Sequence, residues 1–188
     1  YKYLGLRLQS NLKFNDHVEA VRANMRRGIA VLSRMRRLSS ICLRRQVYYS
    51  LVNSHMVYML SIYGSTYKSA LDPLRRLQKR AKRIMTVSTL TTEWNQVESL
   101  ARVPSLDASY VVSLCRLKFY ECERITRPTH KYSTRFKSTG NLSTPKANRT
   151  LAQTSVNARF IKIYNELPVE IKELFQNPDE KKKKILKE

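Results

Sequence analysis

The residue types that most often carry out enzyme chemistry are few in this sequence, and their spacing does not suit it. The candidate metal ligands are three histidines and three cysteines: His17, His55, His130, Cys42, Cys115 and Cys122. Zinc motifs need closely paired ligands, such as two cysteines separated by about two to four residues. Cys115 and Cys122 are seven positions apart, or about two helical turns, which is typical of packing positions. The sequence therefore predicts no metal site.

Candidates for nucleophilic or two-metal catalysis are also missing. No serine or cysteine lies in a strained turn of the G-x-S-x-G type, which would expose a nucleophile. No two aspartates lie together, as a two-metal phosphoryl-transfer site requires. We therefore expect no catalytic residue within this chain.

Unopposed positive charge is the strongest feature of the sequence. The formal net charge is +22, from 36 lysines and arginines against 14 aspartates and glutamates. No acidic residue lies between Ala20 and Leu71, between Pro73 and Thr92, or between Arg124 and Asn165. Long stretches of one sign create a field that attracts a polyanion, whose binding then releases counterions. The expected partner is nucleic acid.

Two stretches place these cations on one face of a helix. The first begins near Asn15 or Asp16, either of which could cap it, and ends just before Arg36. Its apolar face contains Val18, Val21, Met25, Ile29 and Leu32, and its basic face contains Arg22, Arg26, Arg27, Arg34 and Arg37.

The second stretch, 71–85, has the clearest period, with Pro73 expected in the first turn, where its missing N–H is harmless. The basic arc opposite its apolar residues contains Arg75, Arg76, Lys79, Arg80, Lys82 and Arg83. These six residues and the five basic residues of the first helix are the predicted nucleic-acid contacts.

Basic helix faces can also have other roles. A solvated surface is the ordinary one, and a helix lying on a membrane usually has bulkier apolar residues than Ala81 and Met85. Arginines unopposed over consecutive helices favour phosphate contacts instead. Some of the eleven tyrosines could stack on unpaired bases, although most are expected in the core or hydrogen-bonded at the surface.

The remaining sequence predicts a mainly α-helical fold. Residues 1–8 alternate as a short strand does. Further helices are expected over 43–52, with an apolar continuation to Gly64 that periodicity cannot assign, and over 105–123. An irregular basic connector follows, and order returns over 158–175. No apolar run approaches the roughly 20 residues of a membrane span, so we expect no membrane contact.

Three cysteines in an odd, widely spaced set are typical of reduced thiols. We therefore expect an intracellular protein, nuclear and cytoplasmic. The chain begins at Tyr1 in an apolar run, and we interpret it as a piece of a longer polypeptide.

Four strings, in this order, resemble the region that follows the palm in reverse transcriptases of non-LTR (LINE-type) retrotransposons, of the jockey and CR1 kind. YKYLGLRLQSNLKFNDHVEAV is similar to the family's YLG segment and the L-x-W-x-x-H start of the next helix. SLVNSHMVYMLSIYGSTYKSALDPLRRLQKRAKRIM resembles its S-H-x-x-Y…W-G and L-x-x-L-Q-K-R-A-x-R run. HKYSTRFKS and IYNELPVEIK resemble its H-x-Y-x-T-R and W-N-x-L-P-x-x-I-K elements. Phe14 and Tyr63 stand where the family usually has tryptophan, and both keep an aromatic ring.

The resemblance implies a division of labour. The metal-binding aspartates of such polymerases, with their Mg²⁺, lie upstream in the palm, so this chain would carry neither catalytic residues nor a cofactor. Tyr3, Leu4 and Gly5 match the primer grip, and the helices from Asp16 to Met85 match the thumb that closes over the template–primer duplex. The implied partners are that RNA and DNA duplex and the upstream palm and fingers of the same polypeptide.

The expected domains are a primer-grip-like strand or hairpin over 1–12, a helical thumb-like bundle over 13–125, a basic connector over 126–158, and a C-terminal helical segment over 159–188. The alternative interpretation is a host-adopted, free-standing basic protein that binds RNA or a protein partner.

Overall fold

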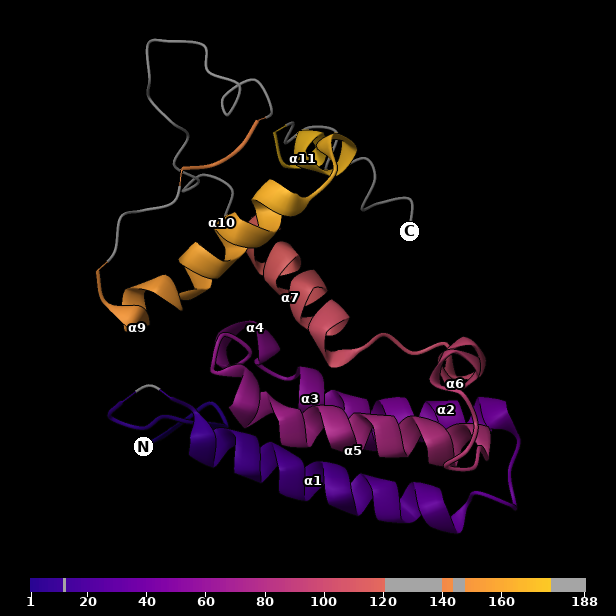
Figure 1. Cartoon of the computed structure of the whole chain (residues 1–188). Coiled ribbons are helices and arrows are strands. Elements are labelled where there is room, and N and C mark those ends of the chain that lie inside the picture. Colours follow the sequence, from indigo (N-terminus) through magenta and orange to yellow (C-terminus); the bar gives the residue numbers. More distant parts are fainter. Residues whose placement is uncertain (12, 121–139, 144–147, 177–188) are drawn as a thin grey trace. The chain divides into compact units, whose positions relative to one another are not determined.

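A computed structural model of the chain describes residues 1–11, 13–120, 140–143 and 148–176 (Figure 1). The fold is mainly α with a short N-terminal hairpin, which confirms the expected fold class. The chain divides into two compact units, unit 1 over Tyr1–Tyr110 and unit 2 over Val111–Glu188. Within the described part, no helix is both long enough and apolar enough to cross a membrane.

The N-terminal hairpin is built around a two-residue turn. Strands β1 (Lys2–Tyr3) and β2 (Leu6–Arg7) are antiparallel, and the turn residues Leu4 and Gly5 have φ of 46° and 82°. Positive φ at both central positions is the form that matches the twist of short hairpins. Glycine adopts it freely, whereas Leu4 needs support. The hydroxyl of Tyr58 supplies that support by donating to the Leu4 carbonyl at 2.6 Å.

Helix α1 (Asn15–Arg34) begins and ends close to its predicted bounds. Its N-cap is Phe14, which has a φ of 59° and makes no side-chain capping bond, so the expected cap at Asn15 or Asp16 is wrong. Asp16 lies in the first turn instead, where a carboxylate is favoured by the helix dipole. The helix ends before Arg36, as predicted.

The stretch that periodicity could not assign is helical, in four pieces. These are α2 (Ile41–Tyr48), the π-helix η1 (Tyr49–Asn53), α3 (Ser54–Val57) and α4 (Leu60–Tyr63). A break precedes α4, because Met59 has a φ of 56°. Helix α1 passes very close to η1, and a Cβ at Gly28 would collide with the carbonyl oxygen of Leu51.

Helix α5 (Lys68–Thr86) begins three residues before the predicted start at Leu71. Pro73 therefore lies in the second turn, and its expected position in the first turn is wrong. Helices α6 (Trp94–Ala101) and α7 (Leu106–Tyr120) follow. The pattern did not predict α6, whereas the start of α7 is close to the predicted residue 105.

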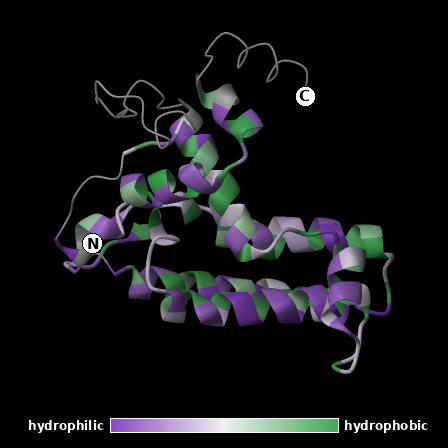
Figure 2. Ribbon diagram, turned by 45° about the horizontal axis from the view of Figure 1, so that its top comes forward, coloured by the Kyte–Doolittle hydropathy of each residue, from purple (hydrophilic) through white to green (hydrophobic). Residues whose placement is uncertain are grey.

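Helices α1 and α5 pack side by side (Figure 1). The α2–α3 run lies between them in the sequence, and α2 contacts both of them. All five residues of the predicted apolar face of α1 are buried. On α5, Leu71, Leu74, Ala81 and Met85 are buried, and Leu77 and Ile84 are partly buried. The hydropathy along both helices can be followed in Figure 2. This packing leaves their polar faces for the surface.

Unit 2 contains α9 (Thr150–Gln153), α10 (Val156–Glu166) and α11 (Val169–Gln176), so the predicted return of order is confirmed. The Asn165 side chain accepts from Leu142 N at 2.8 Å and donates to Leu142 O at 3.1 Å. Lys172 Nζ donates to Asn141 Oδ1 and to Asn165 O, each at 2.9 Å. Most of the expected connector 126–158 lies outside the described residues, and the expected domain bounds stay predictions.

Candidate nucleic-acid interface

Two hollows in the surface of unit 1 are lined by cations from α1 and α5. The first has a volume of about 520 Å³ and is lined by Arg26, Ile29, Ala30, Ser33, Arg34, Leu77 and Arg80. The second, of about 630 Å³, is lined by Arg36, Arg76, Lys79, Arg80, Arg83, Ile84, Ser88, Thr89 and Leu90. Neither lining contains a carboxylate. Because Arg80 lines both, we call the two hollows together the basic groove.

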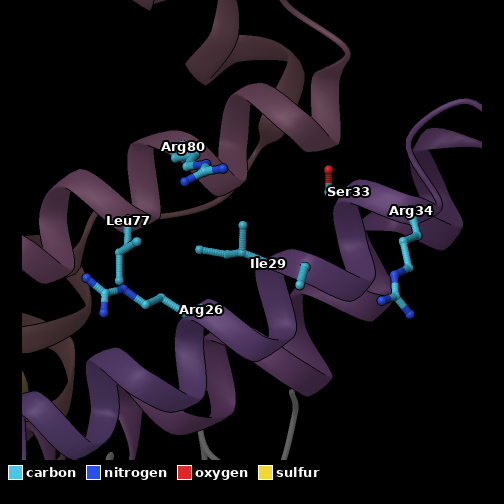
Figure 3. Close-up of a pocket in the computed structure, with 7 residues that line it drawn as sticks. Arg26, Ile29, Ser33, Arg34, Leu77 and Arg80 are labelled. Atoms are coloured by element: carbon cyan, nitrogen blue, oxygen red, sulfur yellow. The ribbon is translucent and has the colours of Figure 1, made fainter.

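The groove follows from how the two amphipathic helices pack. Burying the apolar faces of α1 and α5 in one core leaves Arg26 and Arg80 exposed on neighbouring helices. Figure 3 shows Ile29 and Leu77 lying between these two arginines. A guanidinium can donate two parallel hydrogen bonds to a phosphate. The groove therefore offers phosphate-binding groups on both sides of a short apolar strip.

Two of the predicted contacts that lie at the surface, Arg22 and Arg75, are held by carboxylates of their own chain. Arg22 Nη1 lies 2.8 Å from Glu19 Oε1. Arg75 is shared between Asp72 and Asp107, each at 2.7 Å. The hydrogen bond from Arg75 lowers the pKa of the Asp107 carboxyl. These pairs cancel part of the positive charge at the two sites.

Lys82 lies in the interior and not on the exposed basic arc, so the expectation of an exposed position is wrong. Its side chain is 1% exposed, and its Nζ lies 3.3 Å from Glu98 Oε1. The ammonium also lies 5.7 Å from the centre of the Trp94 ring. Helix α6, which supplies both partners, packs against α5 at this point.

Lys79 and Arg83 surround the same tryptophan, with Lys79 Nζ at 5.3 Å and Arg83 Cζ at 5.9 Å from the Trp94 ring centre. Arg83 Nη1 also donates to the carbonyls of Thr89 and Leu90, the second at 3.2 Å. Arg83 thus holds the loop after α5 in place. Lys79 is exposed and keeps its ammonium at the surface.

The remaining six predicted contacts are exposed and have no hydrogen-bond or ion-pair partner for their side chains within the described part of the chain. They are Arg26, Arg27, Arg34, Arg37, Arg76 and Arg80. Four of them, Arg26, Arg34, Arg76 and Arg80, line the basic groove. These four are the groups best placed to bind an anion.

Other arginines of the acid-free blocks hold the fold together. Buried Arg44 donates through Nε to Met85 O at 2.7 Å and through Nη1 to Arg36 O at 3.1 Å. Arg45 Nε donates to Ala101 O at 3.0 Å. The carbonyls at helix ends have no partner within their helix, and these two arginines satisfy several of them. Their charge alone could not reveal this role.

The residues that match the primer grip form the tip of the hairpin. Tyr3 and Leu4 are 59% and 65% exposed, and Gly5 is exposed beside them. All three are accessible to a ligand.

Histidines and cysteines do not gather into a metal site within the described residues, where no group of three or more potential ligands occurs. His17 is buried, stacks edge-on to Tyr63 at 4.9 Å, and has no hydrogen bond on either ring nitrogen. Burial, with a contribution from Arg7, lowers the pKa of His17. Burial also raises the pKa of the half-buried Cys115 thiol. Cys122 and His130 lie outside the described residues.

The chain is similar to the RNA-directed DNA polymerase from mobile element jockey of Drosophila melanogaster. The two are 28% identical over 109 residues, which cover 56% of this chain and 12% of that polymerase. No family model matches the chain, and no solved structure matches it. The similarity supports a relationship to non-LTR reverse transcriptases, as the four strings indicate. The primer-grip and thumb assignments stay predictions.

Proposed function

We propose that unit 1 binds a nucleic-acid duplex through the basic groove, as the thumb-like part of an RNA-directed DNA polymerase from a non-LTR retrotransposon. The observation that carries this proposal is the set of four exposed arginines that line the groove and have no partner among the residues that the structure describes. The similarity to the jockey polymerase adds support. Because the chain spans 12% of that protein, the polymerase activity, its Mg²⁺, and the palm and fingers that would hold it belong to a longer polypeptide in this proposal.

The groove would bind phosphates rather than read bases. Arg26 and Arg34 on α1 and Arg76 and Arg80 on α5 would contact the backbone of an RNA–DNA hybrid, whose wide, shallow minor groove gives side chains little sequence to read. Contacts of this kind let a duplex translate along the protein. The exposed hairpin tip, Tyr3–Gly5, would lie beside the primer in the role of a primer grip. A nuclear and cytoplasmic location is part of the same proposal.

Replacing the four groove arginines by glutamine tests the proposal. In the variant R26Q/R34Q/R76Q/R80Q, affinity for an RNA–DNA duplex should fall. The slope of log affinity against log salt should become shallower by up to about four contacts' worth. Thermal stability should change little, because the replaced side chains are exposed and glutamine favours helices. Binding is measured by fluorescence anisotropy over a range of salt concentrations.

A variant with the same loss of charge outside α1 and α5 provides the control. R102Q/R116Q/R149Q/K162Q removes four exposed basic residues that do not line the groove. We expect it to bind more tightly and with a steeper salt slope than the groove variant. Equal losses in the two variants would mean that net charge, and not the groove, determines binding. If a protein ligand displaced the duplex, the result would favour the alternative interpretation, a free-standing basic protein that binds a protein partner.

A further inference from the structure

We propose that the hairpin end of unit 1 is a binding site for unpaired nucleotides, with Tyr58 and Tyr67 as the rings on which the bases stack. This inference rests on the proposed function, because the unpaired bases would belong to a strand that continues from the duplex in the basic groove. It names the substrate more closely, as a junction between a duplex and a single strand.

Tyr58 offers a ring that is exposed and already fixed in place. It follows α3, its side chain is 50% exposed, and its hydroxyl donates to the Leu4 carbonyl at 2.6 Å. A Cβ on Gly5 would lie 3.5 Å from Tyr58 Cε1, so the ring also contacts the turn of the hairpin. A ring held at its polar end loses little freedom when a base stacks on it, which favours binding.

Tyr67 offers a second such ring with a cation beside it. It is the N-cap of α5 and is also 50% exposed. Lys13 Nζ lies 6.0 Å from its ring centre, and Thr66 Oγ1 donates to the Lys13 carbonyl at 2.6 Å. The Lys13 backbone is thus tied to the residue that precedes Tyr67. An ammonium next to an exposed aromatic face is the combination that single-strand binding sites use, one for the phosphate and the other for the base.

The charge around these tyrosines suits an anionic strand. The exposed cations near these tyrosines include Lys2, Arg7, Lys13 and Lys68, and the nearby carboxylates include Asp16, Glu19 and Asp107. Glu19 is paired with Arg22 and Asp107 with Arg75. Figure 1 shows the hairpin and the start of α1 at the same end of unit 1. By contrast, Tyr48 and Tyr63 are fully buried, and their hydroxyls bond to groups of the core.

The hairpin end lies within reach of the basic groove. Tyr67 immediately precedes α5, and Arg76 lies nine residues further along the chain. At 1.5 Å per residue these positions are about 14 Å apart along the helix axis. A strand with about 3.4 Å per stacked nucleotide covers that distance in roughly four steps. One strand could therefore leave the groove and reach the tyrosines.

The experiment compares three ligands on the full chain at one salt concentration: a blunt RNA–DNA duplex, the same duplex with a short oligo-uridine extension, and the oligo-uridine alone. The parent protein should bind the extended duplex more tightly than the blunt one. In the variant Y58A/Y67A this gain should be lost, a change of about 5- to 150-fold per stacked base. Affinity for the blunt duplex should change far less, because the groove arginines stay in place.

Two further variants separate stacking from structure. Y58F/Y67F keeps both rings and loses the hydroxyl bond to Leu4, so it should retain most of the gain from the extension. Y49A removes a tyrosine that is 40% exposed in η1, where it packs edge-on against Tyr48, and it should also retain the gain.

The inference is overturned if the extension adds no affinity, or if Y58A/Y67A keeps the gain. If the chain binds no blunt duplex, yet binds oligo-uridine in a way that Y58A/Y67A abolishes, the proposed function fails and the single-strand site stands.

Discussion

Arginine serves two purposes in unit 1, and the position of each guanidinium decides which one. Arg44 and Arg45 donate to the carbonyls at the ends of other helices, whereas Arg26 and Arg80 are exposed and unpartnered within the described part of the chain. All four belong to acid-free blocks of the sequence. Since the Met85 and Ala101 carbonyls, which Arg44 and Arg45 bind, lie 41 and 56 residues away in the sequence, sequence reasoning could not separate these two uses.

His17 makes the stability of unit 1 depend on pH. Burial lowers its pKa in the folded protein from the ordinary value of 6.5, so the unfolded chain takes up the proton first as the pH falls. Folding stability should therefore be complete above about pH 7 and decrease towards pH 5.5. The free energy of unfolding, from urea titrations at several pH values, measures this decrease.

The variant H17F should remove most of that pH dependence. Phenylalanine keeps a ring against Tyr63. It has no nitrogen that could take up a proton, and none that would lack a hydrogen-bond partner as both nitrogens of His17 do. H55Q alters an exposed histidine and should retain the decrease of the parent protein. If H17F and the parent lose equal stability between pH 7 and pH 5.5, His17 is not the group responsible.

The faces of individual helices were the most predictable features at the scale of elements. The apolar residues of α1 were identified from their period alone, and all of them are buried. The same period also places Lys82 at the edge of the apolar face of α5. At about 100° per residue, Lys82 lies only about 20° from Leu71. What the sequence lacked was a signal for α6, which covers Lys82. Helix α6 has eight residues, too few for a convincing period.

One ion pair, between Lys82 and Glu98, joins α5 to α6. In the variant E98Q the Lys82 ammonium, which is 1% exposed, loses its carboxylate and keeps a neutral amide oxygen. We expect E98Q to lower the free energy of unfolding by about 1–3 kcal/mol, the usual cost of an inadequately paired buried polar group. Urea or thermal denaturation measures the loss.

The matched control is E93Q, the same change at the exposed N-cap of α6. It should alter stability by no more than about 0.5 kcal/mol, as is usual for surface positions. K82M should be tolerated better than E98Q, because it removes the buried charge itself while Glu98 stays partly exposed. Equal stability of E98Q and E93Q would show that the pair does not hold α6.

At the scale of the whole molecule, carboxylates and cations are distributed so that one region keeps its charge. Unit 1 has nineteen lysines and arginines and six aspartates and glutamates. Four of those six acids pair with Arg22, Arg75 and Lys82, none of which lines the basic groove. The blocks of charge in the sequence therefore predict a polyanion partner. Only the fold indicates which cations are not paired with carboxylates and are available to bind it.

This distribution leads to a prediction about binding by the intact chain. The six predicted contacts that are exposed and unpartnered within the described part of the chain are all arginines. If all six meet phosphates, log affinity for duplex DNA should fall linearly with log salt with a slope of about −5. This slope amounts to a loss of roughly 10³ between 50 and 200 mM salt. Because phosphates are the same at every step, scrambling the base sequence of the duplex should change the affinity little. Anisotropy titrations with two scrambled duplexes over this salt range provide the measurement. A flat salt response, or a strong preference between the duplexes, would contradict binding through the phosphate backbone.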